Sequence, residues 1–198
     1  MIDPAHPEYI HVDLARHLPQ VPPKSTDTWD LGADLAPGHR LRAHRIRMAH
    51  LNGIKYRRVG STQVKRGILS TQLLVPDYTK IETFDWLSPH DDEDWSFLAT
   101  MAPAPVGFLA QACCTIAPLL IRAKGLDAFL GIHRIVNECD PGDSVFLTTH
   151  CPIAEMGIGV ALEQNQPVQD LEKGEIARFA FTPAGKFVAL TRLPVPTG

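Results

Sequence analysis

A long apolar stretch, from Pro103 to Leu126, constrains the fold more than any other feature of this 198-residue chain. Between Val106 and Ile121, Gln111 and Thr115 are the only polar side chains. A helix that is apolar on all sides is buried, and these two polar residues together with Pro118 make the stretch unsuitable as a membrane span. We therefore expect a helix that runs through the core of the protein and bends at Pro118.

The size and composition of the chain are those of a single domain with a core of its own. The net charge of −3 excludes no class of partner. Four cysteines are too few for a disulfide-stapled secreted fold, and the polar segment Met1–Pro22 contains no recognisable signal peptide. We therefore expect a cytoplasmic protein whose cysteines serve as thiols, as ligands or as small core residues.

The order of the other elements predicts an α+β domain preceded by an arm. Residues 1–38 contain six prolines, which predict an extended arm with one short helix near residues 9–17. The domain then spans residues 39–198. Its strands are expected over residues 41–51, 54–59, 68–75, 80–86, 131–138, 144–149, 157–164, 176–182 and 186–192, with turns at Asn52-Gly53 and at residues 140–143. The last two strands should form a hairpin in which Ala177, Phe179 and Phe181 share one face. Together these elements predict an antiparallel sheet wrapped around the buried helix.

Charge is distributed unevenly along the chain. Residues 35–76 contain nine Lys or Arg and no acidic residue, which would attract an anion such as a phosphate, a coenzyme A tail or a nucleic acid. No recognition helix, zinc spacing or aromatic-basic pattern accompanies them, so we expect an exposed basic sheet face and no nucleic-acid partner. The acidic run at 88–94 lacks the ligand spacing of a metal site and is expected to be a solvated loop, or the partner of the basic face in a second subunit.

Two cysteines far apart in the sequence could carry thiol chemistry. A peroxide-reducing cysteine must be a thiolate beside a positive group, and its sulfenic acid can condense with a second cysteine. Cys114 on the apolar helix and Cys151, just ahead of Pro152, are a candidate pair. Cys113 and Cys114 are a poor pair with each other, because successive helical residues point about 100° apart. Buried cysteines are also common as inert core residues.

The order of several short motifs resembles that of the OsmC/Ohr family of thiol-dependent organic hydroperoxide reductases. The apolar helix contains Ala112-Cys-Cys-Thr115 and leads into Ala123-Lys-Gly-Leu-Asp127, as the central segment of that family does. Cys151-Pro-Ile153, followed by the apolar run Ile158-Gly-Val-Ala-Leu162, is similar to the family's second-cysteine segment. Lys65-Arg-Gly67 resembles the turn that carries the family's arginine beside the reactive thiol.

This resemblance implies an OsmC-like fold and two-electron reduction of organic hydroperoxides. Cys114 would be the peroxidatic thiol, Cys151 the resolving thiol and Arg66 the cation that stabilises the thiolate. The pocket for the hydroperoxide would be lined by Phe108, Gln111, Cys113 and Thr115. The resemblance further implies an intertwined homodimer, a cellular dithiol as reductant, and no cofactor.

Other functions remain open on the same residues. A hotdog-type acyl-coenzyme A thioesterase or dehydratase also wraps a sheet around one helix, although residues 103–121 lack the carboxylate or histidine that such enzymes use. A non-catalytic binding or structural subunit would keep its cysteines buried. Soft metal ligands could gather around His150 and Cys151 together with His133, Cys139 or Cys113, but no Cys-x-x-Cys or His-x-x-x-His spacing is present, and no metal site is expected.

Overall fold

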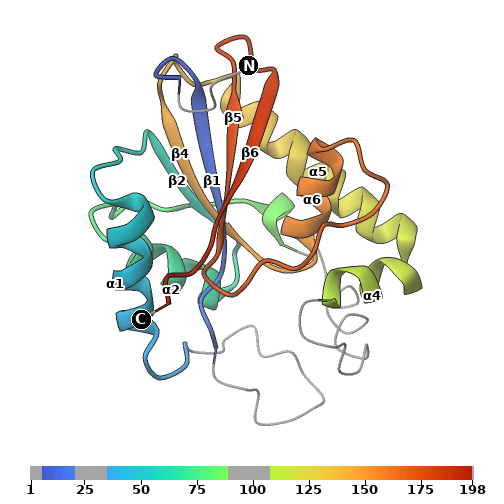
Figure 1. Cartoon of the computed structure of the whole chain (residues 1–198), viewed down its shortest axis with the longest axis horizontal. Helices are drawn as coiled ribbons and strands as arrows, with labels where there is room; N and C mark the ends of the chain where they lie inside the picture. The colour runs from blue at the N-terminus through green and yellow to red at the C-terminus, as the bar shows by residue number, and fades with distance from the viewer. Residues whose placement is uncertain (1–5, 21–34, 89–107, 198) are drawn as a thin grey trace.

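The computed structural model describes residues 6–20, 35–88 and 108–197, and its centre is a six-stranded mixed sheet (Figure 1). The strands are β1 (Ile10–Arg16), β2 (Arg58–Ser61), β3 (Glu82–Thr83), β4 (Ser144–Thr149), β5 (Ile176–Phe181) and β6 (Phe187–Leu193). They lie in the order β3-β2-β4-β1-β5-β6. The first four strands of this order are parallel to one another, whereas β5 is antiparallel to β1 and β6 to β5.

Helices cover both faces of the sheet (Figure 1). The α-helices are α1 (His39–Ile46), α2 (Lys65–Leu74), α4 (Leu109–Ile116), α5 (Pro118–Val136) and α6 (Ile153–Ala161), with a π-helical turn η1 (Arg47–Leu51) and a 3-10 turn η2 (Asp85–Leu87). Figure 1 shows α1 and α2 on one side of the sheet and α4, α5 and α6 on the other. The molecule is therefore a three-layer α/β/α domain.

The alternation of side chains along the central strands builds two hydrophobic cores. In β1, Ile10, Val12 and Leu14 pack into the cluster shared with α5 and α6, while Ala15 packs into the cluster under α1 and α2. Since successive strand residues point to opposite faces, one apolar strand can supply both clusters. Parallel strands buried on both faces are typical of this layering.

The predicted OsmC-like fold is wrong. The sheet is mixed rather than antiparallel, and the apolar stretch does not form one buried central helix. The chain breaks at Ala117 into α4 and α5, because Pro118 has no N–H to donate and instead begins a new helix. Ile116 and Leu119 on either side of the break are 60% and 82% exposed. Within the parts of the chain that are described, no helix is long and apolar enough to cross a membrane.

The first half of the chain differs most from the prediction. Residues 10–16, assigned by sequence to an arm with a short helix, form the strand β1 in the middle of the sheet. The expected hairpin over 41–59 is α1 and η1 followed by a loop. Gly53 does adopt the positive φ (+81°) of a turn, but the turn follows a helix. Ala43 and Ile46, three residues apart, are the buried positions of α1 and show the helical period.

Three further predicted strands are helices or parts of helices, and two predicted pieces of sheet are confirmed. Residues 68–75 belong mainly to α2, 131–138 mainly to the end of α5, and 157–164 mainly to α6. In contrast, β4 covers the predicted strand 144–149, and β5 and β6 form the predicted last hairpin. Ala177, Phe179 and Phe181 do share one face. Residues 103–107 and most of the acidic run 88–94 lie outside the described residues.

The close contact of α5 with α6 should depend on a glycine. A Cβ atom at Gly125 would lie 2.8 Å from the backbone carbonyl carbon of Met156, which cannot move without shifting α6. Gly125→Ala should therefore lower the free energy of unfolding, measured by urea denaturation, by about 1–3 kcal/mol. Gly157→Ala on the facing helix is the matched control, because its nearest neighbours would be 3.5 and 3.6 Å away. It should be neutral or stabilising by up to about 1 kcal/mol. Equal effects of the two variants would contradict this account.

Candidate active site

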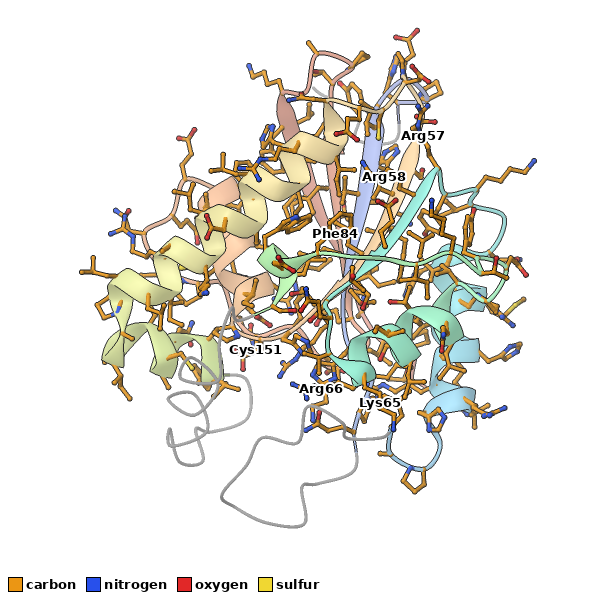
Figure 2. The ribbon with its side chains drawn as sticks, turned by 180° about the vertical axis from the view of Figure 1, so that it is seen from behind. Arg57, Arg58, Lys65, Arg66, Phe84 and Cys151 are labelled. Atoms are coloured by element: carbon orange, nitrogen blue, oxygen red, sulfur yellow. The ribbon has the colours of Figure 1, made fainter. Side chains whose placement is uncertain are left out.

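A group of basic side chains gathers where the central parallel strands end. From β1 the chain crosses β4 to reach β2, by way of α1 on one face of the sheet. From β4 it crosses β1 to reach β5, by way of α6 on the other face, so the connections leave the adjacent strands β1 and β4 in opposite directions. In open α/β sheets this switch point, at the carboxyl ends of the strands, is where ligands bind. Figure 2 shows Arg66 and Cys151 at this end of the sheet, and Arg57 and Arg58 at the opposite end.

Arg16 and His17 stand at the end of β1. The backbone N–H of His17 donates to the carbonyl of Thr149 at the end of β4 (3.1 Å), which continues the parallel pairing by one residue. The Arg16 guanidinium donates to the carbonyl of Leu171 (2.5 Å) and lies 3.9 Å from Glu155 Oε1. Arg16 and His17 are therefore fixed by the sheet and by the loop that precedes β5.

The tautomer of His17 follows from the hydrogen bond made by its Nδ1 atom. His17 Nδ1 lies 2.7 Å from the carbonyl oxygen of Leu18, which can only accept. Nδ1 must therefore carry the proton, and in the neutral ring Nε2 has the lone pair. Nε2 takes no part in this bond. The neutral ring is thus held in one orientation with Nε2 unprotonated.

His150 follows β4 directly and faces His17. The centroids of the two rings are 4.9 Å apart, and His150 Nε2 lies 3.1 Å from Thr62 Oγ1. Thr62 comes directly after β2 and also shares a short hydrogen bond with Ser88. Three neighbouring parallel strands, β1, β4 and β2, therefore each deliver a polar residue to the same place.

Helix α2 brings a second arginine to the site. Arg66 is 1% exposed, and its charge reaches both His17 and His150, whose pKa values it lowers. The helix is held there because Ser70 Oγ accepts from the Leu18 N–H (2.9 Å) and donates to the Arg66 carbonyl (2.6 Å). The sequence-predicted role of Arg66 was to stabilise a thiolate, and the structure places it beside two imidazoles instead.

Burial and positive charge keep both histidines neutral. The pKa of His17 falls to about 3, chiefly through burial and then through the charge of Arg66. Burial also lowers the pKa of His150 well below its usual value. Lys173, in the loop before β5, has a lowered pKa for the same reason, and Arg16 and Arg66 add to the shift. The site therefore combines neutral imidazoles with cationic side chains, which suits an oxyanion that bears several charged oxygens.

Two of the four cysteines lie in surroundings that disfavour the thiolate. All four are free thiols. Cys113 is fully buried in α4, where burial raises its pKa to about 11, and Cys151 is buried after β4 with its pKa raised well above normal. Both shifts disfavour the thiolate on which peroxide reduction depends. Cys114 is half-buried in α4.

The predicted pocket residues lie on α4 and at its start. Phe108 is 52% exposed, Gln111 is half-buried, and Thr115 is exposed with its hydroxyl donating to the Gln111 carbonyl (2.9 Å).

Sequence reasoning missed the residues at the strand ends. Arg16 and His17 were assigned to the arm, and His150 was considered only as a soft metal ligand. A usable signal was present, because Arg16-His17 directly follows residues 10–15, in which Ile10, Val12 and Leu14 alternate with other residues, and His150 directly follows the predicted strand 144–149. A polar residue at the end of a buried strand is a site candidate in a parallel sheet. The misassigned β1 concealed it.

Comparisons with known proteins give the fold. No family model and no curated protein matches the chain. Among solved structures, it is similar to a phosphoglycerate mutase from Bacillus anthracis str. Sterne (13% identity, TM-score 0.64, 91% of each chain covered) and to Bacillus stearothermophilus YhfR (13%, 0.67, 90% of this chain and 94% of that one). It is also similar to the protein histidine phosphatase SixA in complex with tungstate (14%, 0.57, 91% and 96%). The chain therefore has the fold that these structures share.

This similarity overturns the predicted function as well as the predicted fold. Similar structures that are described by an activity include a phosphoglycerate mutase, a protein histidine phosphatase and an alpha-ribazole phosphatase, and they do not have the fold of the OsmC/Ohr family. The organic hydroperoxide and dithiol partners are contradicted with it, and the thioesterase and structural-subunit alternatives do not match either. The order of several short motifs was not specific enough to identify the OsmC/Ohr family, because the segments that carry these motifs form other secondary structure here than in that family.

The depressed pKa of His17 should make stability depend on pH. In the unfolded chain His17 binds its proton near pH 6.5, and in the folded protein only near pH 3. The unfolded state therefore holds more protons between these values, and stability falls as pH is lowered through this window. When the pH is lowered from 7 to 5, the unfolding free energy of the wild type should fall by about 2 kcal/mol more than that of His17→Asn, measured by urea denaturation. The exposed control His44→Asn should leave the loss unchanged. An unaltered pH dependence in His17→Asn would show that His17 is protonated normally in the folded protein.

Proposed function

We propose that this chain catalyses phosphoryl transfer from a phosphorylated substrate, with His17 as the nucleophile. The observation that carries the proposal is the fixed tautomer of a buried, neutral His17, whose ring centroid lies 4.9 Å from that of His150 and whose pKa is lowered by burial and by the charges of Arg66 and Arg16. A neutral imidazole is a nucleophile, whereas an imidazolium is not. The surrounding cations are suited to the charge that develops on transferring phosphoryl oxygens.

The reaction takes two balanced steps. In the first, His17 Nε2 attacks phosphorus, the N–P bond forms, and the bond from phosphorus to the leaving oxygen breaks with its electron pair going to that oxygen. In the second, water attacks the phosphohistidine, the N–P bond breaks, and inorganic phosphate leaves with His17 restored to its neutral form. The Nδ1–H bond to the Leu18 carbonyl holds the ring in orientation through both steps.

The other residues have separate roles in this proposal. The fixed guanidinium of Arg16 and that of Arg66 bind the non-bridging phosphoryl oxygens, for which the planar fork of arginine is better suited than an ammonium. His150, beside His17 and held by Thr62, donates a hydrogen bond to the same phosphoryl group. The similarity to structures described as phosphatases supports this assignment, as does the tungstate in one of them, an oxyanion that resembles phosphate in shape and charge.

The proposal predicts steady-state turnover of p-nitrophenyl phosphate, whose leaving group needs no proton. His17→Asn should lower kcat/KM by about 10³-fold or more, because the nucleophile is removed. Arg66→Lys should lower it by about 10²-fold, because the bidentate contact is lost while the charge is kept. Phosphate release is the measurement, with circular dichroism to confirm folding of each variant.

Cys114→Ser is the control for this experiment, because its side chain has no part in the proposed reaction. It should retain the wild-type kcat/KM. Undiminished phosphate release by folded His17→Asn would refute the role of His17, and complete inactivity of the wild type toward phosphomonoesters would refute the proposed reaction.

A further inference from the structure

A second group of side chains, which has no role in the proposed phosphoryl transfer, lies near Arg16. Cys151, Glu155 and Asp170 are brought together from the end of β4, the first turn of α6 and the loop before β5. One ligand atom of each, the Cys151 Sγ and a carboxylate oxygen of each acid, lies within 4.8 Å of the other two. Their exposed fractions are 8%, 0% and 8%, so all three are removed from bulk water.

One atom of this cluster has no partner. Glu155 Oε1 accepts the backbone N–H of Leu171 (2.9 Å), but the fully buried Oε2 makes no hydrogen bond in the described structure. Buried carboxylate oxygens are normally satisfied, and one that is not requires an explanation. Glu155 Oε2 belongs to the same carboxylate that faces Cys151 and Asp170, so a cation bound by the cluster would satisfy it.

The cluster also has the outer contacts that ligating carboxylates have. Asp170 Oδ1 and Oδ2 accept the backbone N–H groups of Ala110 (3.0 Å) and Leu109 (2.9 Å), at the start of α4. The Leu171 N–H does the same for Glu155. Each carboxylate oxygen has a second lone pair, so these bonds orient the carboxylates without using up their ability to bind a metal.

We propose that Cys151, Glu155 and Asp170 bind a zinc ion. A thiolate with two carboxylates is a donor set that zinc accepts, and three protein ligands leave the fourth tetrahedral position for water. In a tetrahedral site with bond lengths of about 2.0–2.3 Å, the ligand atoms lie about 3.5 Å apart. A small rotation of the side chains therefore closes the cluster on the metal.

Charge balance supports a divalent cation at this place. Three anionic ligands, one zinc ion and the neighbouring Arg16 guanidinium, 3.9 Å from Glu155, sum to zero. The Arg16 guanidinium also donates to the Leu171 carbonyl, so its position does not depend on Glu155 alone. Because Cys151 directly follows His150, the bound metal would also hold the chain segment that carries His150.

The site can be tested with cobalt, which reports its ligands by absorption. The untagged full chain, stripped with a chelator and kept reduced, is titrated with Co²⁺. One equivalent should bind and give both the visible bands of a low-coordinate site and a thiolate-to-cobalt charge-transfer band, and Zn²⁺ should displace it. Cys151→Ser should abolish the charge-transfer band, and Glu155→Gln should weaken Co²⁺ binding by at least about 10-fold. Cys139→Ser, a half-buried thiol outside the cluster, is the matched control and should bind as wild type.

Thermal unfolding provides a readout that is independent of absorption and of activity. Zn²⁺ should raise the Tm of the wild type and of Cys139→Ser, and should leave Glu155→Gln nearly unchanged. The proposal is overturned if the folded wild type binds no stoichiometric Co²⁺, or if the charge-transfer band survives in Cys151→Ser. If Cys151→Ser does not fold, wild-type affinity in Glu155→Gln would overturn the proposal on its own. Phosphatase activity enters none of these outcomes, so failure of the metal site and failure of the proposed function can be distinguished.

Discussion

The parallel pairing of β1 with β4 determines where the polar residues of this molecule meet. Their register places Arg16 opposite Thr149, and the bond from the His17 N–H to the Thr149 carbonyl extends it by one residue. His17 and His150, which are 133 positions apart in the sequence (150 − 17), are thereby brought to a ring separation of 4.9 Å. Since both strands are buried on both faces, the pairing cannot slip by a residue without exposing an apolar side chain.

The electrostatics of the site follow from this burial. Removing two imidazoles from water beside the charge of Arg66 favours their neutral forms, and the Leu18 carbonyl then determines which nitrogen of His17 carries the proton. A concentration of positive charge in a buried site is unfavourable until an anion enters. In the proposed reaction, the same feature that costs the folded protein stability gives it an affinity for a phosphoryl group and keeps His17 in its nucleophilic, neutral form at neutral pH.

The sequence predicted the C-terminal part of the fold better than the rest. β4 and the β5–β6 hairpin have β-branched and aromatic residues, clear alternation and a Pro-Ala-Gly turn, so local and tertiary preferences agree there. The helix α6 is buried on nearly all sides, and a short apolar run does not show by itself whether it is a strand or a helix. In β1, the charged and polar residues His11, Asp13 and Arg16 obscured the strand. Asp13 is buried there because Arg178 from β5 pairs with it and the Tyr56 hydroxyl donates to it, and no local pattern reveals these distant partners.

The candidate site illustrates the same limit. Arg66 was selected from the sequence for its place in a motif, and the structure puts it beside groups that the motif did not include. Cys151 was selected as a reactive thiol, whereas the fold buries it between two carboxylates that are four and nineteen residues further on. Sequence spacing identifies ligands only when they lie on one helix, strand or loop. Here the residues around His17, and likewise the cluster of Cys151, Glu155 and Asp170, come from several such elements.

The measurement that tests the central claim most directly is the identification of the phosphorylated residue during turnover. The protein is mixed with excess p-nitrophenyl phosphate, quenched in base, in which phosphohistidine is stable, and analysed by intact mass and peptide mapping. The account predicts one added phosphoryl group on the peptide that contains His17, lost in mild acid and absent from His17→Asn. A phosphoryl group on another residue, or turnover without any phosphorylated protein, would contradict it.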